Sequence, residues 1–546
     1  MILRLLSRFL VVALTALGVG AAAWVAVELL STLPPPARTS SATDGTGLRL
    51  SRGGQHLLLL RGSPYALGFH NARLASDLLR RQEDTLLDLL FGFARGPAKA
   101  MLVRQLSLFY LTGLDRYLTD AERQEILGLA EGTADPFPDL GPRYTRLTAY
   151  HAIHELSQRF ATDSPTFACS LLAVSGARTA DGHALVMRNF DFEGGEVFDR
   201  DKTVVVVRPQ TGLGHVSVAW AGMAGVVSGI NAAGLVVTIN AGASADYRRV
   251  GAPTSLLVRR ALEGAATIDA AVRILTATPR FVTDIIGLAD ASGAVAVLEL
   301  LPERFALRRG DVLVATNHLE APAFAADPVN ETRRCQTTTA VRHDRLDRLV
   351  AEHPGTSWTV ADLLRVSRDR RAADGAPLPL GHRHAIDALI ATHAVIFDAA
   401  AKQLWVSAGP HTLGPYHGYD VQALLQAVDR STAAAAYLPS LPEDPLVARY
   451  PQIAAARLAW QTTRQALEAG DLATAAARLP QTAALANHPT TLTLQAELAH
   501  AARDDDAARE FLHRALAAPP EFPEATRGIT ELEAGLAPVR GAGRAP

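Results

Sequence analysis

The spacing of apolar residues changes abruptly at one point along the chain. In residues 48–167 apolar residues recur every three to four positions, as in "ASDLLRRQEDTLLDLLFGFA" and "LTAYHAIHELSQRF", which predicts helices. At Cys169 the pattern changes to short apolar runs separated by turns, which predicts strands. The first two runs form "CSLLAVSGARTADGHALVMRNFDF", in which Asp181 and Gly182 supply the tight turn of a hairpin.

Further strands follow this hairpin. The segments "KTVVVVRPQTGLGHVSVAWAGM" and "GVVSGINAAGLVVTINAG" predict two more hairpins, which turn at Gly212, Gly214 and Gly234. A helical stretch, "TSLLVRRALEGAATIDAAVRILTAT", comes next. It is followed by the strands "DIIGLADASGAVAVLELL" and "RFALRRGDVLVATNH", two short helices, and a last hairpin, "HAVIFDAAAKQLWVSAGP". This order predicts an α+β fold in which helices cover the sheets.

The C-terminal part of the chain is rich in alanine and helical in period. The segments "GDLATAAARL" (470–479) and "RDDDAAREFL" (503–512) begin 33 positions apart, with Pro489 and Pro519 at matching breaks. This spacing is close to the period of about 34 residues that is typical of tetratricopeptide repeats. A short array of helical hairpins is therefore expected. A plain helical cap on the preceding domain is the alternative, because the aromatic and glycine signature of that repeat is poorly kept.

The N-terminus carries a long uncharged stretch. Residues 10–27 hold no charged side chain and follow two arginines, which predicts a membrane-spanning helix with the rest of the chain on the extracytoplasmic side. A signal peptide cleaved near residues 21–23 is the alternative. We therefore expect a membrane anchor over residues 1–33, followed by a linker rich in Pro, Ser, Thr and Gly over residues 34–47.

Composition narrows the function. The chain has 546 residues, and its 53 Lys and Arg nearly balance its 55 Asp and Glu, so no basic surface for nucleic acid is expected. Its two cysteines are too few for a disulfide framework, and no spacing outlines a zinc site. We therefore expect no metal and no cofactor, and one cysteine is a candidate for chemistry.

Cys169 has suitable neighbours for that role. Arg188 and Asp191 in "MRNFDF" lie on the strand expected beside it. A cation lowers the pKa of a nearby thiol, and a carboxylate orients an amine, so this pair suits a reactive cysteine. Alternatively, Cys169 is a small buried apolar residue, and Arg188 and Asp191 form a surface ion pair. Cys335, in "ETRRCQTT", has no comparable neighbours.

Several motifs together resemble a known family. The segments "CSLLAV", "DGHALVMRNFDF", "GVVSGINAAGLVVTINAG", "VATNH", "TTTAVRHDRL" and "IATHAVIFDAAAKQLWVSAGP" occur in the order found in cysteine N-terminal-nucleophile hydrolases. Over about residues 62–420 the sequence resembles their isopenicillin N acyltransferase-like group, whose relatives include acid ceramidase and the bile salt hydrolases. The resemblance implies a four-layer αββα fold, made as a precursor that cuts itself between Ala168 and Cys169. The expected domains are a helical propeptide over 48–168, a catalytic domain over 169–435 and a helical tail over 451–536.

The resemblance also implies roles for individual residues. Cys169 would be the nucleophile, and its freed α-amine, with an ordinary pKa of about 8, would be the base. Asp191 would orient that amine, Arg188 would stabilise the thiolate, and Asn240 would donate a hydrogen bond to the oxyanion. The other expected site residues are Asn317 and Arg342 at polar positions of the site, and His318, Thr392 and His393 along the substrate pocket.

Structural roles are the alternative for some of these residues. Asn231, beside the turn at Gly234, is interpreted as a turn residue, and Asn240 would otherwise be one too. Arg342 would otherwise lie on a helix surface. A single histidine such as His318 is often only hydrogen-bonded in place.

The implied reaction is attack on an acyl amide, formation of a thioester and release to water or to an amine. The expected substrate is a small acyl amide, of amphiphilic character if the protein lies at a membrane. One alternative is a phospholipase B-like esterase with the same fold. Another is a catalytically dead, membrane-anchored protein whose helical tail binds a protein partner, although the joint presence of Cys169, Arg188, Asp191 and Asn240 argues against it.

Overall fold

The computed structural model describes a large part of the chain. The described residues are 32–93, 108–109, 111–160, 168–353, 355, 357–536 and the single positions Gly20, Ala22, Val25, Ala26 and Leu29.

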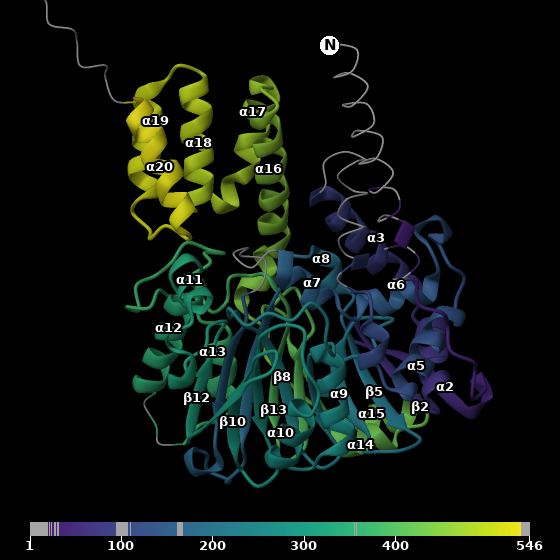
Figure 1. The fold of residues 1–546 in the computed structure, drawn as a ribbon. Coiled ribbons are helices and arrows are strands. Elements are labelled where there is room, and N and C mark those ends of the chain that lie inside the picture. The colour runs from purple at the N-terminus through teal and green to yellow at the C-terminus, as the bar shows by residue number, and fades with distance from the viewer. Residues whose placement is uncertain are drawn as a thin grey trace, which may run out of the picture.

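Two large sheets form the centre of the protein (Figure 1). The nine-stranded sheet contains, in spatial order, β1 (Gly45–Arg52), β2 (Gln55–Gly62), β5 (Thr203–Pro209), β6 (His215–Ala219), β7 (Ser228–Asn231), β8 (Val236–Ala241), β9 (Asp284–Ala289), β10 (Val295–Leu300) and β11 (Phe305–Arg309). The seven-stranded sheet contains β12 (Val312–Ala315), β3 (Ser170–Val174), β4 (Leu185–Asp191), β13 (Ala391–Asp398), β14 (Gln403–Ser407), β15 (Tyr416–Asp420) and β16 (Tyr437–Leu441). Neighbouring strands are antiparallel except for the parallel pair β2 and β5.

Helices cover the outer faces of both sheets. Over the nine-stranded sheet lie α2 (Pro64–Leu74), α5 (Asp120–Glu131), α9 (Thr254–Gly264) and α10 (Ile268–Thr276). Over the seven-stranded sheet lie α12 (Thr339–Ala351) and α13 (Val360–Ser367). The other helices below the tail are α3 (Ser76–Phe93), α6 (Arg143–Tyr150), α7 (Ile153–Phe160), α8 (Glu196–Arg200), α11 (Pro328–Gln336), α14 (Val421–Gln426) and α15 (Arg430–Ala435). Short 3-10 turns are η1 (Ala42–Asp44), η2 (Leu114–Tyr117), η3 (Pro138–Leu140), η4 (Gly176–Arg178), η5 (Pro322–Phe324), η6 (Pro445–Arg449) and η7 (Leu479–Leu485).

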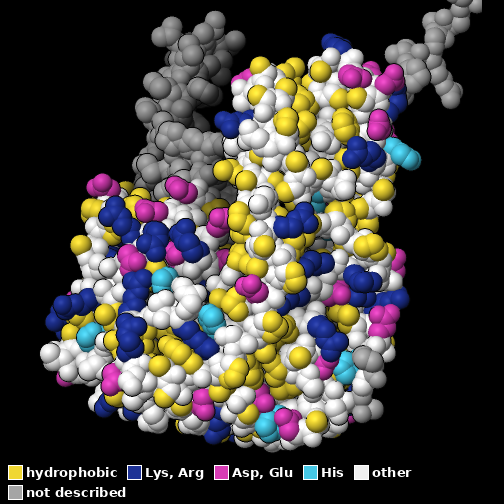
Figure 2. Space-filling view, turned by 180° about the vertical axis from the view of Figure 1, so that it is seen from behind, with side chains coloured by type: hydrophobic (Ala, Val, Ile, Leu, Met, Phe, Trp, Pro, Cys, Tyr) yellow, Lys and Arg dark blue, Asp and Glu magenta, His cyan; other side chains and the backbone are white. Residues whose placement is uncertain are grey.

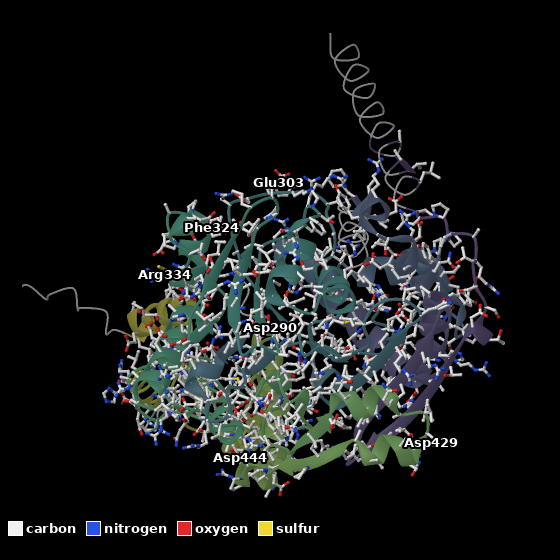
Figure 3. All side chains as sticks on the ribbon, turned by 90° about the horizontal axis from the view of Figure 1, so that it is seen from below. Asp290, Glu303, Phe324, Arg334, Asp429 and Asp444 are labelled. Carbon is white, nitrogen blue, oxygen red and sulfur yellow. The ribbon has the colours of Figure 1, made fainter. Side chains whose placement is uncertain are left out.

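The main core lies between the two sheets. Leu171 and Val186 from one sheet pack there with Val216 and Val297 from the other. Because helices also cover the outer faces, strands such as β4 are buried on both sides, which explains their continuous apolar runs. In the view from below, Asp444, after β16, and Glu303, before β11, lie on opposite sides of the molecule (Figure 3). The layers are therefore helix, sheet, sheet, helix, and the predicted αββα architecture is confirmed.

The hairpins predicted from the sequence form as expected. β3 pairs with β4, β5 with β6, β7 with β8, and β13 with β14, all antiparallel. The first hairpin differs in its connection: residues 175–184 join β3 to β4 in place of the expected tight turn, and Gly182 within them has φ +77°. The sheet continues past the predicted domain end at residue 435, because β16 adds one more strand.

The leader, expected to be mostly helical, begins with two strands. Residues 45–62 form the hairpin β1–β2, and β2 joins the central sheet beside β5. Leu57, Leu58 and Leu60 in this hairpin are buried. A run of four leucines fits a strand buried on both faces as well as a helix, so periodicity alone could not decide between them.

The prediction of a membrane-anchored protein is corrected. In the part of the chain that the structure describes, no helix has both the length and the apolar character needed to cross a membrane. The two longest described helices, α3 and α16 (Tyr450–Glu468), each carry several charged residues. Most of the predicted anchor, residues 10–27, lies outside the described residues.

The tail is helical, as its sequence predicts. It consists of α16, α17 (Leu472–Arg478), α18 (Pro489–Ala501), α19 (Asp505–Ala515) and α20 (Pro523–Leu536), which stand on one end of the sheets (Figure 1). Asp471 and Asp504, 33 positions apart, cap α17 and α19, and each accepts a hydrogen bond from the backbone three residues on. Gly470 and Arg503, which precede them, both have positive φ. The two similar segments therefore share the same helix cap and the same backbone conformation before it.

Candidate active site

The site lies between the two sheets, at the end where Cys169 enters β3. Ser170 on β3 pairs with Asn189 on β4, so Cys169 lies beside Phe190 and Asp191. Cys169 is only 1% exposed. The hairpin predicted from the sequence therefore brings the thiol next to the expected charged residues.

Two residues hold the backbone of Cys169. Its N–H donates to Oδ1 of Asn317 (2.8 Å), and its carbonyl accepts from Nη1 of Arg342 (2.6 Å). Nη2 of Arg342 also donates to the same Asn317 oxygen (2.8 Å). Asn317 follows β12 and Arg342 belongs to α12, so Arg342 is buried in the site and does not lie on a helix surface.

Arg188 joins the thiol to the second sheet. Its Nη2 lies 3.6 Å from Sγ of Cys169, and its Nε donates to Oδ1 of Asn240 on β8 (3.2 Å). Its Nη1 donates to Oγ of Ser228 on β7 (3.0 Å). Because the side chain is fully buried, Arg188 is no surface ion-pair residue. Sequence reasoning missed Ser228, a small polar residue inside an apolar strand.

The electrostatics of the site suit proton transfer. Burial raises the pKa of the Cys169 thiol, while the charge of Arg188 opposes this rise. Burial also raises the pKa of Asp191 to about 7, against the lowering effect of Arg342. Oδ2 of Asp191 is buried and has no hydrogen-bond partner. A carboxyl group with a pKa near 7 can exchange a proton at neutral pH.

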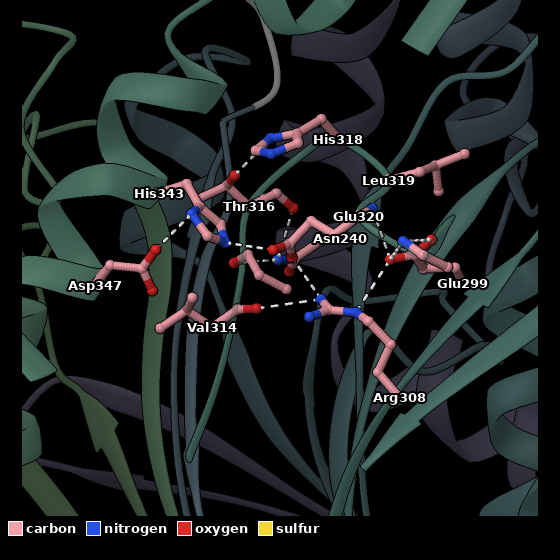
Figure 4. A network of polar contacts seen from close by, with 12 residues as sticks. Asn240, Glu299, Arg308, Val314, Thr316, His318, Leu319, Glu320, His343 and Asp347 are labelled. Atoms are coloured by element: carbon pink, nitrogen blue, oxygen red, sulfur yellow. Dashed lines mark hydrogen bonds and ion pairs between the residues drawn. The ribbon is translucent and has the colours of Figure 1, made fainter. Parts of the chain in front are cut away.

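Asn240 is at the centre of the site, but its amide is engaged. Its Nδ2 donates to the carbonyls of Thr316 (3.1 Å) and Ala315 (3.4 Å), as Figure 4 shows from close by. Its Oδ1 is the atom that faces Arg188. In this arrangement the amide serves backbone carbonyls, so its oxyanion role stays a prediction.

The three expected pocket residues lie in different places. His393 is buried against Phe190, and its Nε2 lies 3.0 Å from Oγ of Ser228. Nδ1 of His318 lies 3.0 Å from Oγ1 of Thr339, and its ring lies 5.2 Å from that of His343. Thr392 lines a cavity.

That cavity has a volume of about 760 Å³ and lies between the sheets and the tail. Its lining includes Phe192, directly after Asp191, together with Arg383 from the loop before β13 and Arg457 from α16. Sequence reasoning missed both arginines, because no local pattern reveals a contact between the tail and the catalytic domain.

Other polar residues have structural explanations. The side chain of Asn231 donates to the carbonyls of Leu262 and Ala265 and accepts from two backbone amides of its own turn, as its interpretation as a turn residue requires. Cys335 is exposed, and its thiol contacts Glu331.

Metal binding has one geometric candidate in the described part of the chain. Asp181, His183 and Asp398 cluster at the turn of the first hairpin, at the other end of β3 from Cys169. His183 already pairs with Asp398 (2.9 Å), which accounts for the cluster without an ion.

Comparison with known proteins identifies the domain. The model of the family described as acyl-coenzyme A:6-aminopenicillanic acid acyl-transferase matches residues 178–411. Residues 178–411, which are less than half of the chain, are therefore similar to this family. The matched segment contains Arg188, Asp191, Asn240, Asn317 and Arg342, begins shortly after Cys169 and ends before the tail.

Individual proteins are similar to parts of the chain. An uncharacterized protein of Archaeoglobus fulgidus is 25% identical over 272 residues, which are 47% of this chain and 45% of that protein. The chain therefore spans about half the length of this curated relative. A Caenorhabditis elegans ortholog of N-acylethanolamine-hydrolyzing acid amidase matches at a TM-score of 0.30 and 17% identity, covering 42% of this chain and 93% of that one. Penicillin V acylase from Agrobacterium tumefaciens matches at 0.30 and 15% identity, covering 50% and 98%.

Proposed function

We propose that this chain is a self-processing hydrolase or acyltransferase of acyl amides, with Cys169 as its nucleophile. The observation that carries the proposal is the way Cys169 is held. Asn317 and Arg342 bind its backbone, Arg188 faces its thiol, and Asp191 lies beside it with a free carboxylate oxygen. A cysteine with only a packing role needs none of these contacts.

The first reaction would be cleavage of the chain itself. Asp191 accepts the thiol proton, and the sulfur attacks the carbonyl carbon of Ala168. The C–N bond to Cys169 breaks, so the acyl group is transferred from nitrogen to sulfur, and the nitrogen takes up a proton to become an amine. Water then hydrolyses the thioester, leaving a carboxylate on Ala168 and a free amine on Cys169. Arg342 supports this step by fixing the Cys169 carbonyl at 2.6 Å.

The second reaction would use the same thiol on a substrate. The freed amine of Cys169, which has an ordinary pKa of about 8, accepts the proton from the thiol of the same residue. Asp191 would then orient that amine, as the family resemblance implies. Attack on an acyl amide releases its amine and leaves a thioester, which water or another amine resolves.

N-terminal sequencing and intact mass test the proposal. Wild-type protein should give a fragment that begins at Cys169, whereas the Cys169→Ala variant should remain one chain. Cys335→Ala is the matched control, because it removes the other cysteine, which is exposed and bound only to Glu331, and it should cleave like wild type. An active but uncleaved wild-type chain, or a fragment with another first residue, would refute the assignment of the nucleophile.

Substrate panels distinguish the proposal from an esterase. Cleaved protein should hydrolyse acyl amides and lose this activity in Cys169→Ala. Turnover of acyl esters alone would favour the esterase alternative. Absence of both activities in a cleaved protein would favour the alternative of a catalytically dead interaction protein.

A further inference from the structure

We infer that the helical tail forms one wall of the substrate pocket, and that this pocket takes an acyl amide with an apolar body and an anionic group. The inference rests on the proposed function for the reaction, while ligand binding can be tested without it. It concerns the cavity of about 760 Å³ between the sheets and the tail.

The cavity starts beside the candidate base. Phe192, the residue after Asp191, lines it, and so does Thr392, whose Oγ1 donates to the carbonyl of Phe190 (3.2 Å). Ala391, next to Thr392, is the strand partner of Asp191. A ligand in this cavity would therefore lie close to the end of β4, where Asp191 is located.

The opposite wall belongs to the tail. α16 contributes Ala454, Leu458 and Trp460 to the lining, and the indole N–H of Trp460 donates to the carbonyl of Thr490 on α18 (3.2 Å), which fixes its ring. Together with Phe192 and Leu380 from the domain, these residues make much of the lining apolar. Figure 2 shows apolar side chains distributed over this tail as well.

Hydrogen bonds hold the tail against the domain. Nε2 of His382 lies 2.8 Å from the carbonyl oxygen of Pro519, and the backbone N–H of Arg383 donates to Oε1 of Glu521 (2.7 Å). The hydroxyl of Tyr450 lies 2.9 Å from Nε2 of His411. The cavity therefore lies in a hydrogen-bonded interface between the domain and the tail. The family model ends at residue 411, so it does not include the wall that the tail forms.

Two arginines, Arg383 and Arg457, lie among the polar residues of the cavity lining. Arg457 donates to the carbonyls of Leu389 (2.6 Å) and Ala388 (3.3 Å), and no carboxylate lies within ion-pair distance of it among the described residues. Nη1 of Arg383 is buried without a hydrogen-bond partner, although its Nη2 pairs with Glu193. Both arginines line the same cavity, and the charge of Arg457 is among the causes that lower the pKa of Arg383.

The acidic residues of the cavity already have partners. Glu193 pairs with Arg383, Glu521 with His488 (3.4 Å), and Glu196 accepts from the hydroxyl of Tyr450 (3.4 Å). One guanidinium N–H of Arg383 without a hydrogen-bond partner therefore remains on the cavity, together with Arg457, which makes no ion pair among the described residues and feels Glu196 and Glu521 only from a greater distance. A carboxylate on the ligand would satisfy both.

Calorimetry with decanoate and decanol, which share an alkyl chain and differ in charge, tests the binding. The full chain is used as Cys169→Ala, so cleavage plays no part. Decanoate should bind more tightly than decanol. Arg457→Gln should weaken decanoate binding at least about tenfold and leave decanol unchanged, because it removes a charged hydrogen bond. Arg464→Gln is the control, since Arg464 lies on the same helix but pairs with Glu497 outside the cavity.

Equal binding of decanoate and decanol, or an equal loss in Arg457→Gln and Arg464→Gln, would overturn the inference. Trp460→Ala provides a second variant and should weaken both probes, because they share the apolar wall. If Arg457→Gln fails to fold, the preference for decanoate over decanol and the Trp460→Ala result still test the inference.

Turnover adds a readout that separates this inference from the proposed function. In cleaved protein with Cys169 intact, Arg457→Gln should lower kcat/KM for N-decanoyl-β-alanine and not for N-decanoylpropylamine. Normal cleavage at Cys169 with unchanged selectivity would refute the inference and leave the proposed function standing. A chain that binds decanoate selectively but never cleaves would refute the proposed function alone.

Discussion

Replacing Asp191 with asparagine removes a buried acid while preserving its shape. Burial raises the pKa of Asp191 from the ordinary 3.8 to about 7. This shift of about three units corresponds to about 4 kcal/mol at 1.36 kcal/mol per unit. Asp191→Asn should therefore change how the stability of the protein depends on pH.

The sign follows from proton binding. Between about pH 4 and pH 7 the folded protein keeps a proton on Asp191 that the unfolded chain has released. The stabilisation that Asp191 contributes is therefore fully present below its pKa in the unfolded chain. It is lost as pH rises through its pKa in the folded protein, near 7. In Asp191→Asn this loss is absent, so the variant should gain stability relative to its parent as pH rises.

Urea unfolding in the uncleaved Cys169→Ala chain measures the effect. Between about pH 4.5 and about pH 8, the parent should lose up to about 4 kcal/mol more unfolding free energy than the chain that also carries Asp191→Asn. Asp84→Asn is the control, because Asp84 is exposed on α3, and it should leave the pH dependence of the parent unchanged. Identical pH dependence with and without Asp191→Asn would refute the reasoning that this carboxyl group titrates near neutral pH.

Three further variants test neighbouring parts of the structure. Arg342→Met removes the charged donor to the carbonyl of Cys169 and to Asn317, so self-cleavage should slow by about a hundredfold in a time course of intact mass. Asn231→Ala breaks four hydrogen bonds in a buried turn and should cost about 2–4 kcal/mol in urea unfolding, with cleavage unchanged. Glu155→Gln removes an acid whose pKa burial raises to about 7, so it should reduce the loss of stability between about pH 4.5 and pH 7, again in urea unfolding.

The hairpins and the repeat could be predicted because their signals are local. β3 and β4 pair as neighbours in the chain, and their register places Arg188 and Asp191 near Cys169. In the tail, Asp471 and Asp504 repeat a helix cap at the spacing that the sequence shows. Each of these features depends on a few residues that are close in the chain.

The remaining features depend on contacts between distant segments. β2 is a strand because β5, more than a hundred residues later, pairs with it, and a run of leucines does not encode that partner. Arg457 reaches the carbonyls of Leu389 and Ala388, which no pattern in the helical tail indicates. The hydrogen bond from Asn240 to the carbonyl of Thr316 also depends on how the two sheets pack. The sequence motif therefore predicted that Asn240 lies in the site, but not which groups it bonds.

The leader strands bear on what self-cleavage would do. A cut before Cys169 separates the chain, but β2 pairs with β5 over residues 56–62 and buries Leu57 and Leu58 in the two cores. The leader helices add further contacts, since Oε1 of Glu155 on α7 accepts from the backbone N–H of Thr254 on α9 (2.7 Å). Dissociation of the leader would therefore expose an edge of the central sheet together with apolar surface, which is unfavourable in water. Cleavage should consequently act at the site itself, by freeing the amine of Cys169, while both fragments remain one folded protein.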